Sequence, residues 1–493
     1  MQNGTHLAAI DLGSNSFRLE IGRYEFGHIQ RVEYLKETVR QGSGLDEEHN
    51  LSGEAMQRGW DCLARFSERL ANFPRAQVRA VATQTLREAR NSNVFLKRGS
   101  RVLGHPIDVV SGLEEARLIY QGVSRLLPQS AERRLVVDIG GRSTELILGQ
   151  QFTAHAVASF HVGSVAWSTR FFTDGQFSVA AFAAAEIAAK AVLDEALETY
   201  RPSQWDVAYG SSGTVGAVGD VLAATGQSAR DTITRSGLDW LRERLLRVQS
   251  ADRLRLEGLK DDRRAVIGGG LSVLRAVFDL LDIQEMHVAQ GALRQGALYD
   301  LLDREQPETD LRTVTVLGLI HSFAIDPLHA ERVARTACSL FTQLSTTPPE
   351  SVLRKLNWAS RLHEIGCRIS HSDYHRHGAY ILENTDAAGF AKHELHRLGS
   401  LVLGHRGKVR KLQADLEDAT FIWQLMSLRL AVALCHARRD PDLDGLVLSI
   451  RGNRFDLAAR SGWAAAYPQS AHLLREEALA WQRTPWELEI QLP

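Results

Sequence analysis

The sequence of 493 residues has little of several features that mark specialised classes of protein. Its four cysteines lie far apart and form no CxxC pair, which fits reduced thiols better than a disulfide framework or a zinc site. No apolar run approaches about 18 residues, so no membrane span is predicted. The chain opens without a basic segment followed by an apolar stretch, so we expect no signal peptide and a cytoplasmic protein.

An excess of charge of one sign is also missing. Lys and Arg total 58 and Asp and Glu total 59, so no global basic surface predicts a nucleic-acid partner. Any anionic ligand must then be bound by a local patch. Hydrophobic residues make up 44% and charged residues 24%, as in ordinary globular proteins, and the length predicts roughly two to four domains.

One stretch of the chain occurs twice. AIDLGSNSFRLEIG (Ala9–Gly22) aligns without a gap on VVDIGGRSTELILG (Val136–Gly149), and Asp11 then meets Asp138. Each copy predicts a strand, a tight turn and a second strand. Two such units about a domain's length apart predict a duplicated α/β fold with the active site between the halves.

The two turns have the chemistry of an anion site, because small residues let consecutive backbone N–H groups approach an anion closely. A carboxylate before each turn, Asp11 or Asp138, can hold a magnesium ion that neutralises phosphate. A third turn, in VAYGSSGTVGAVGDVL, adds a weaker signal. Two ordinary glycine hairpins are the alternative. The candidate phosphate-binding residues of the turns are Gly13, Ser14, Asn15, Ser16, Gly140, Gly141, Arg142, Ser143 and Gly213.

The turns, together with ATQTLREARN, VVSGLEEARLIYQGV and GALRQGALYD, resemble a known family. They resemble the superfamily of sugar kinases, actin and actin-like chaperone ATPases, and within it the exopolyphosphatase / guanosine pentaphosphate phosphohydrolase family. The exopolyphosphatase branch is the closer fit. The resemblance implies two actin-like α/β domains (1–125 and 126–303), a mostly helical HD-like domain (304–445) and a small C-terminal α/β domain (446–493).

Glu115 is the candidate catalytic base. Ser111 is a plausible helix N-cap, which places Glu114 and Glu115 in the first helical turn, where both could simply complement the helix dipole. Hydrolysis of a phosphoanhydride, however, needs a carboxylate that orients or deprotonates water. The resemblance selects Glu115 for this role.

The resemblance also assigns further site residues. It makes Asp138 and Glu145 the magnesium carboxylates, with Asp11 as a weaker candidate, and it places Arg87 near the cleft. Arg142 stands where the family usually has glycine. Because arginine is a planar, permanently charged donor, we expect it to grip the second or third phosphate of the substrate; a solvated turn residue is the alternative.

Three later stretches resemble an HD phosphohydrolase domain: HAERVARTA at His329, RLHEIG at His363 and LMSLRLAVAL near Val432. The metal site of that domain needs a histidine, a His-Asp pair and a final aspartate. Here Glu364 replaces the paired aspartate and Val432 the final one. Because valine cannot ligate a metal, we expect an HD-like fold without hydrolase activity, whose remaining histidines could still bind phosphate or an adventitious metal.

A local basic patch lies in LGHRGKVRKL, which contains Arg406 and Lys408. It is either a solvated helix end or a groove that guides a long polyanion toward the cleft. Beyond residue 445, LVLSIR, RFDLAA and WELEIQ predict short strands around a helix.

The sequence therefore predicts a cytoplasmic, magnesium-dependent exopolyphosphatase that processively removes the terminal phosphate of inorganic polyphosphate. Potassium as an additional activator and a homodimeric state are further expectations. Hydrolysis of guanosine pentaphosphate (pppGpp) by the same site is the main alternative. A small-molecule kinase and a non-catalytic polyphosphate or alarmone sensor are the others.

Overall fold

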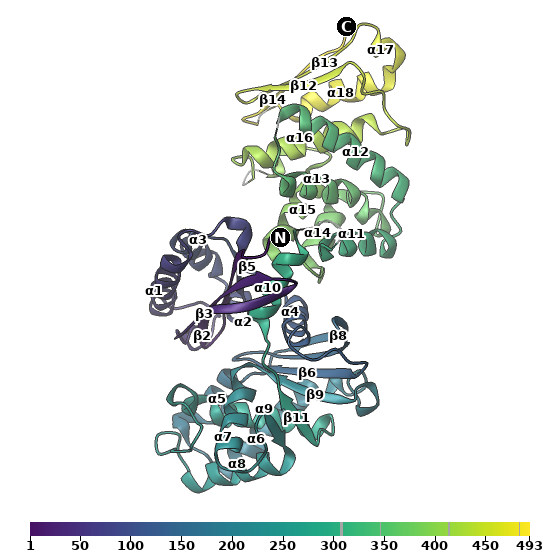
Figure 1. Cartoon of the computed structure of the whole chain (residues 1–493). Coiled ribbons are helices and arrows are strands. Elements are labelled where there is room, and N and C mark those ends of the chain that lie inside the picture. The colour runs from purple at the N-terminus through teal and green to yellow at the C-terminus, as the bar shows by residue number, and fades with distance from the viewer. Residues whose placement is uncertain (306–308, 346, 413–414, 483) are drawn as a thin grey trace. The chain divides into compact units, whose positions relative to one another are not determined.

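The computed structural model describes residues 1–305, 309–345, 347–412, 415–482 and 484–493, in two compact units. Unit 1 is Met1–Thr309 and unit 2 is Asp310–Pro493 (Figure 1). Each unit has its own apolar core and is described by itself.

The first half of unit 1 is built on a sheet with the strand order β3-β2-β1-β4-β5. β1, β2 and β3 are antiparallel neighbours, whereas β4 and β5 continue the sheet in parallel. The strands are β1 His6–Leu12, β2 Ser16–Glu25, β3 His28–Thr38, β4 Val78–Ala82 and β5 Ile107–Val109. The helices are α1 Gly53–Leu70, α2 Gln84–Glu88, α3 Ser92–Leu103 and α4 Gly112–Ser124.

The second half repeats this architecture in a sheet of order β10-β11-β9-β6-β7-β8. β6, β7 and β8 are antiparallel neighbours, and β9 and β11 continue in parallel. The strands are β6 Arg133–Ile139, β7 Thr144–Gln150, β8 Thr153–Phe160, β9 Val207–Ser211, β10 Thr232–Thr234 and β11 Glu285–Val288. The helices are α5 Ser164–Phe171, α6 Val179–Leu193, α7 Ser212–Ala224, α8 Arg235–Val248, α9 Ile267–Leu280 and α10 Leu293–Asp303. The two strand–turn–strand units predicted from the repeat are therefore confirmed.

The alternation of side chains along β1 and β6 decides where the two aspartates point. Ile10 of β1 and Val137 of β6 belong to the cores of their own halves, whereas Ala9 and Val136 belong to a separate cluster with residues of α4 and α10. Figure 1 accordingly shows α4 and α10 between the two sheets. Because strand side chains alternate with period two, Asp11 and Asp138 point to the side on which α4 lies.

An N-cap residue, Ser111, determines where α4 begins. The Ser111 hydroxyl accepts a hydrogen bond from the Glu114 N–H at 3.2 Å, as predicted for an N-cap, and the last strand residue of β5 is Val109. Glu115 is thereby fixed in the first turn of α4, at the end of the sheet where β1 also ends.

Unit 2 consists of a helical body joined to a small sheet, and its apolar core runs through both. The strand order of the sheet is β12-β13-β14, and the strands predicted near the C-terminus are confirmed. The strands are β12 Leu446–Arg451, β13 Arg454–Ala459 and β14 Glu487–Gln491. The helices are α11 Leu311–Ser322, α12 Pro327–Leu344, α13 Glu350–Arg361, α14 Tyr374–Asn384, α15 Lys392–Gly404, α16 Ala419–Leu434, α17 Trp463–Ala466 and α18 Pro468–Ala480.

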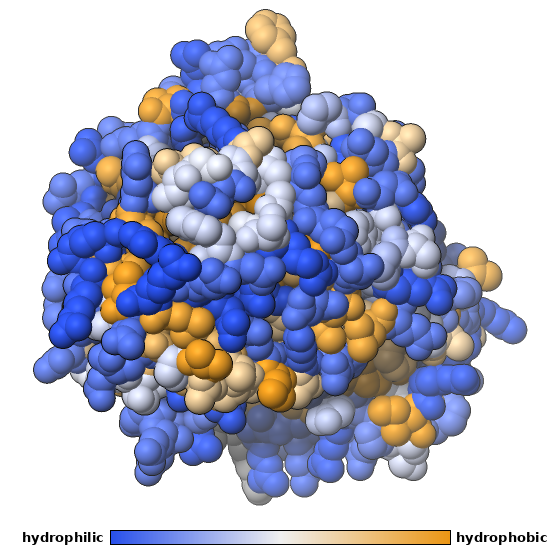
Figure 2. Space-filling model, turned by 90° about the horizontal axis from the view of Figure 1, so that it is seen from below, coloured by the Kyte–Doolittle hydropathy of each residue, from blue (hydrophilic) through white to orange (hydrophobic). Residues whose placement is uncertain are grey.

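The face of the molecule in Figure 2 is mostly hydrophilic, and its hydrophobic residues lie in small separate groups. Every helix formed by the described residues is too short or too polar to cross a membrane.

Candidate active site

The two repeated turns face each other across a small cavity of about 70 Å³. Both turns, the start of α7, Glu115 of α4 and the start of α10 line this first cavity. The turns are so close that a Cβ atom on Gly141 would lie 2.9 Å from the Cβ atom of Ser14, so glycine is required there. The predicted site residues that line the cavity are Asp11, Gly13, Ser14, Asn15, Ser16, Glu115, Asp138, Gly140, Gly141, Ser143 and Gly213.

The third turn enters the cavity through a strained backbone. Ser212, the first residue of α7 directly after β9, has a φ of 77°, which is uncommon for a residue with a side chain. Its hydroxyl donates a hydrogen bond to the Ile139 carbonyl at 2.6 Å, which ties the third turn to the end of β6. Backbone strain of this kind costs on the order of 1–3 kcal/mol and clusters at ligand sites.

Asp138 and Glu145 form a buried pair of like charge. They lie directly opposite each other on the antiparallel strands β6 and β7. Burial raises the pKa of Asp138 to about 6, with a hydrogen bond from Ser211 acting in the opposite direction and Glu115 adding to the rise. Burial, followed by Glu115 and Asp138, raises the pKa of Glu145 well above its usual value. Like charges opposite each other destabilise a sheet unless a cation lies between them.

This carboxylate pair fits a magnesium ion. Glu145 is fully buried; its Oε1 accepts a hydrogen bond from Ser159 at 2.8 Å, and its Oε2 has no partner among the described residues. Carboxylate oxygens are the ligands that Mg²⁺ prefers, and the ion usually also keeps waters and substrate oxygens. An unpartnered buried oxygen beside a second carboxylate therefore fits as part of the oxygen ligand set of a hard divalent cation.

Asp11 has a different environment from Asp138. It lies opposite Arg18 on the strand pair β1–β2, and the Arg18 guanidinium donates to its Oδ2 at 3.0 Å. Arg294 of α10 adds a second cation at 3.7 Å. The charge of Asp11 is thus already balanced by the protein, which makes it a weaker metal ligand than Asp138.

Glu115 is held by Arg87. Its Oε2 accepts a hydrogen bond from the Arg87 guanidinium at 2.7 Å, and the same arginine donates to the Val110 carbonyl and the Gln84 side chain. Burial raises the pKa of Glu115 above its usual value, Arg87 opposes this rise and Asp11 adds to it. A carboxylate with a raised pKa at the edge of the first cavity is suited to accept a proton from water.

Arg142 lies at the tip of its turn but does not line the first cavity. Its guanidinium forms an ion pair with Glu88 of α2 at 2.7 Å and reaches the Gly42 carbonyl at 3.4 Å. Arg142 thus connects the second half of unit 1 to the first. Its predicted contact with the substrate remains a prediction.

A second cavity of about 280 Å³ adjoins the first and shares Arg18, Ser212, Gly213, Arg263 and Ala292 with it. Its lining is basic. The cations that line it are Arg18, Lys36, Lys260, Arg263 and Arg294.

Arg263 is the most buried of these cations, and it has only a weak ion pair. Its side chain is mostly buried, its nearest carboxylate oxygen is that of Asp262 at 4.0 Å, and its guanidinium packs on Gly213. Burial, followed by the neighbouring Arg18, lowers the pKa of Arg263. A crowded and partly buried set of cations is stabilised by a bound anion.

The sequence did not identify Arg18 and Arg263 as site residues. Arg18 could have been found, because the repeat aligns it with Glu145. Arg263 lies in a short 3₁₀ helix (Asp261–Val266) with no recognisable motif, and only the fold brings it to the cavity.

Two predicted phosphate contacts, Arg406 and Lys408, lie in unit 2 just after α15. Both are exposed, and the Arg406 guanidinium lies 4.9 Å from the centre of the Tyr374 ring. Their predicted role as a guide for a polyanion remains a prediction. Val432 packs against the core of unit 2.

Comparison with protein-family models gives two matches. Residues 21–305 match the Ppx/GppA phosphatase family, and residues 311–478 match domain III of Ppx/GppA phosphatases. Both matches agree with the family resemblance found in the motifs.

Two relatives of similar length carry the same name. The chain is 39% identical over 495 residues to a guanosine-5'-triphosphate,3'-diphosphate pyrophosphatase of Vibrio vulnificus, covering 99% of each chain. It is 37% identical over 489 residues to the protein of that name from Pseudoalteromonas translucida, covering 98% of each chain.

Solved structures support the fold. An exopolyphosphatase from Cytophaga hutchinsonii matches with a TM-score of 0.55 at 24% identity, covering 61% of this chain and 98% of its own. The Aquifex aeolicus member of the Ppx/GppA family matches with a TM-score of 0.52 at 22% identity, covering 61% and 99%. The predicted fold class, a duplicated actin-like α/β half followed by a mostly helical part, is confirmed.

Proposed function

The chain belongs to the Ppx/GppA phosphatase family, and from this premise we propose that it hydrolyses the terminal 5′ phosphate of guanosine pentaphosphate, with magnesium as cofactor. The products are orthophosphate and guanosine tetraphosphate. The observation that carries the choice of substrate is the basic second cavity beside the carboxylate-lined first cavity.

The first cavity would hold the reacting phosphate. Its volume of about 70 Å³ suits a single phosphoryl group, and the N–H groups of the repeated turns can bind the phosphoryl oxygens. Asp138 and Glu145 would hold magnesium, which when bound neutralises charge on the phosphate oxygens.

Glu115 would act on the water. The water oxygen forms a bond to the terminal phosphorus, the bond from that phosphorus to the bridging oxygen breaks, and Glu115 accepts the proton that the water loses. Arg87 would hold the Glu115 carboxylate in position through the bond at 2.7 Å. The proposed mechanism therefore assigns the proton transfer to a residue fixed by both a helix start and an ion pair.

The second cavity would hold the remainder of the nucleotide. Guanosine pentaphosphate carries a 3′ diphosphate in addition to its 5′ triphosphate, so its recognition calls for a second group of cations. The second cavity supplies them, and the Tyr34 ring, which lies 5.1 Å from the Arg294 guanidinium, adds an aromatic surface for the nucleoside. The full-length relatives that carry the name of this activity support the same choice.

Hydrolysis of inorganic polyphosphate, the activity first predicted from the sequence, is the second candidate. The repeated turns recognise a phosphate chain end and not a nucleoside, so they accept either substrate. The kinase alternative gains no support from the relatives, which are named as pyrophosphatases, and the sensor alternative gains none from a site that keeps Glu115, Asp138 and Glu145.

Side-by-side assays test the proposal. We expect turnover of guanosine pentaphosphate at a kcat/KM at least tenfold above that for GTP, which lacks the 3′ diphosphate, and magnesium should be required for both. A Lys260→Met variant is the matched probe, because Lys260 lines the second cavity and not the first; the variant should raise KM for guanosine pentaphosphate while leaving turnover of GTP and polyphosphate nearly unchanged. Faster release of phosphate from long-chain polyphosphate than from the nucleotide would favour the second candidate.

A further inference from the structure

Unit 2 brings together three residues that can ligate a metal: His329 of α12, and His363 and Glu364 just after α13. One ligand atom from each lies within 4.8 Å of the other two. His329 is 6% exposed and His363 only 1% exposed, so the two imidazoles meet inside the helical body rather than on its surface. The proposed reaction uses none of the three.

The hydrogen bonds of His363 leave one nitrogen ready for a ligand. Its Nδ1 lies 2.7 Å from the Ser360 carbonyl oxygen, which can only accept, so Nδ1 carries the proton. Nε2 therefore keeps its lone pair. A backbone carbonyl on one imidazole nitrogen is the usual device that orients a metal-binding histidine.

His329 supplies the second observation. Its Nδ1 is buried and has no hydrogen-bond partner among the described residues, whereas its Nε2 lies 3.9 Å from Glu364 Oε1. The Nε2 lone pair therefore faces the Glu364 carboxylate without a direct hydrogen bond, and one ligand atom each of His329, His363 and Glu364 lie close enough together to share an ion.

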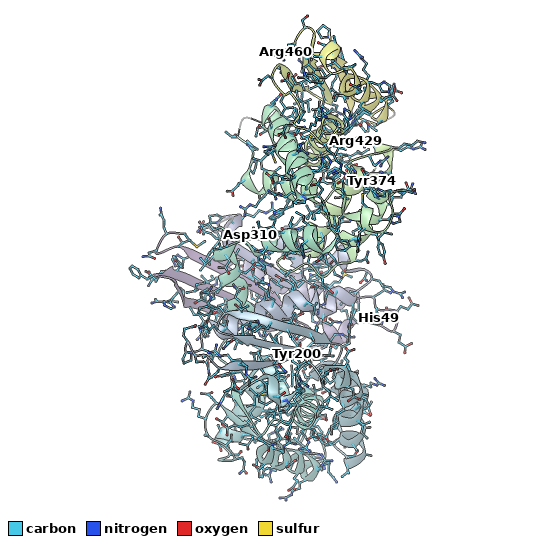
Figure 3. The ribbon with its side chains drawn as sticks, turned by 90° about the vertical axis from the view of Figure 1, so that its right-hand side faces the viewer. His49, Tyr200, Asp310, Tyr374, Arg429 and Arg460 are labelled. Carbon is cyan, nitrogen blue, oxygen red and sulfur yellow. The ribbon has the colours of Figure 1, made fainter. Side chains whose placement is uncertain are left out.

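A neighbouring histidine does not share this property. The rings of His405 and His363 lie 5.4 Å apart between centroids, but His405 uses both nitrogens. Nδ1 donates to the Val402 carbonyl at 2.6 Å, and Nε2 lies 3.3 Å from the hydroxyl of Tyr374. Figure 3 labels Tyr374, which lies in the helical body of unit 2. His405 therefore packs beside His363 but has no free nitrogen to offer a metal ion.

We propose that His329, His363 and Glu364 bind a divalent transition metal ion of the zinc or ferrous iron class, in a site separate from the active site. Two imidazoles and one carboxylate are the ligands that such ions prefer, whereas Mg²⁺ prefers oxygen alone. Three protein ligands leave further positions for water. Because the ligands come from α12 and the segment after α13, the bound ion would join the two helices.

Arg438 limits the affinity of this site. Its guanidinium donates to Glu364 Oε1 at 2.8 Å and also pairs with Asp326 at 3.0 Å. Arg438 is half exposed, so it can move away, but a metal ion must share Glu364 with it. Removal of Arg438 should therefore strengthen metal binding, which a purely structural histidine cluster would not do.

The test uses the full-length protein after dialysis against a chelator, in an excess of Mg²⁺ that occupies the carboxylate site of unit 1. Titration with Co²⁺, followed by its visible absorption, should show one bound equivalent that Zn²⁺ displaces. His363→Gln and Glu364→Gln should lose this equivalent, and Arg438→Gln should bind at least threefold more tightly.

His375→Gln is the matched control, because His375 is 7% exposed with an unpartnered Nδ1 but lies outside the cluster. It should bind Co²⁺ as the wild type does, and all variants should keep the helical circular dichroism signal. Absence of a stoichiometric site in the wild type, or equal loss in His375→Gln and His363→Gln, would overturn the proposal.

Discussion

The two copies of the repeated stretch keep one backbone and differ in the residue opposite the aspartate. In the first copy Arg18 lies opposite Asp11 and forms an ion pair with it; in the second copy Glu145 lies opposite Asp138. The same strand–turn–strand frame thus holds a neutralised carboxylate in one half and an unbalanced pair in the other. Under the proposed function, the first copy would bind phosphate with the charge of its aspartate already balanced, whereas the second copy would need a cation beside its two carboxylates.

The arginine of the first copy has a second role. Arg18 lines both cavities, so the residue that neutralises Asp11 also adds a cation to the basic second cavity. Under the proposed function, the difference at this one aligned position would give the two halves different roles: the first half would supply a cation for the substrate, and the second half would supply carboxylates for the metal.

The largest effect should come from Glu115, which lies between the two copies. Glu115→Gln removes the proton acceptor but keeps the size of the side chain and the N-terminal position in α4. We expect kcat to fall by roughly 10²–10⁴ with KM within a few-fold. Steady-state phosphate release on the wild type and the variant measures both constants.

Glu54→Gln is the matched control for this variant. Glu54 also lies in the first turn of a helix, α1, but is exposed and lies outside both cavities. If both substitutions reduce activity equally, the role of Glu115 is to complement the helix dipole.

The next largest loss of activity should come from Asp138, and it should exceed the loss from Asp11. Asp138→Asn should lower kcat/KM by about 10²–10³, because the remaining carboxylate Glu145 cannot hold magnesium alone. Asp11→Asn should cost about tenfold or less, because it chiefly frees Arg18. Activity should be measured over a range of Mg²⁺ concentrations. The Mg²⁺ concentration that gives half-maximal activity should rise in Asp138→Asn and stay unchanged in Asp11→Asn. Equal losses at the two positions would contradict the division of roles between the copies.

The free energy of unfolding without magnesium should also reflect the unbalanced charge of Asp138. The folded-state pKa of Asp138 is raised to about 6 from 3.8, so the folded protein binds more protons than the unfolded chain between these values. Stability therefore falls as the pH rises from about 4 to about 6 and stays low at pH 7.

Asp138→Asn removes this charge and should raise the free energy of unfolding at pH 7 by about 1–3 kcal/mol. Thermal unfolding in a chelator measures the gain. Addition of Mg²⁺ should stabilise the wild type and not the variant, and a variant less stable than the wild type at pH 7 would rule out a buried like-charge pair.

The sequence predicts the parts of the site that are local. The repeat identified both turns and both aspartates, and strand alternation with the N-cap at Ser111 accounts for their approach to Glu115. Arg263 could not be predicted, because its position depends on the packing of a 3₁₀ helix against α7 and not on any local pattern. The ion pair between Arg142 and Glu88 could not be predicted either, because it depends on how the two halves of unit 1 pack against each other.

The smallest effect should come from the tips of the turns. Asn15 and Arg142 are counterparts, but Arg142 is already paired with Glu88, so a grip on the substrate requires that this ion pair exchange. We expect Arg142→Gly to raise KM two- to fivefold and leave kcat within a few-fold. Glu88→Gln separates the two possibilities: if Arg142 only joins the halves, both variants raise KM equally, whereas if Arg142 grips phosphate, Glu88→Gln releases it and lowers KM. An unchanged KM in Arg142→Gly would make the arginine an ordinary turn residue, equivalent in function to Asn15.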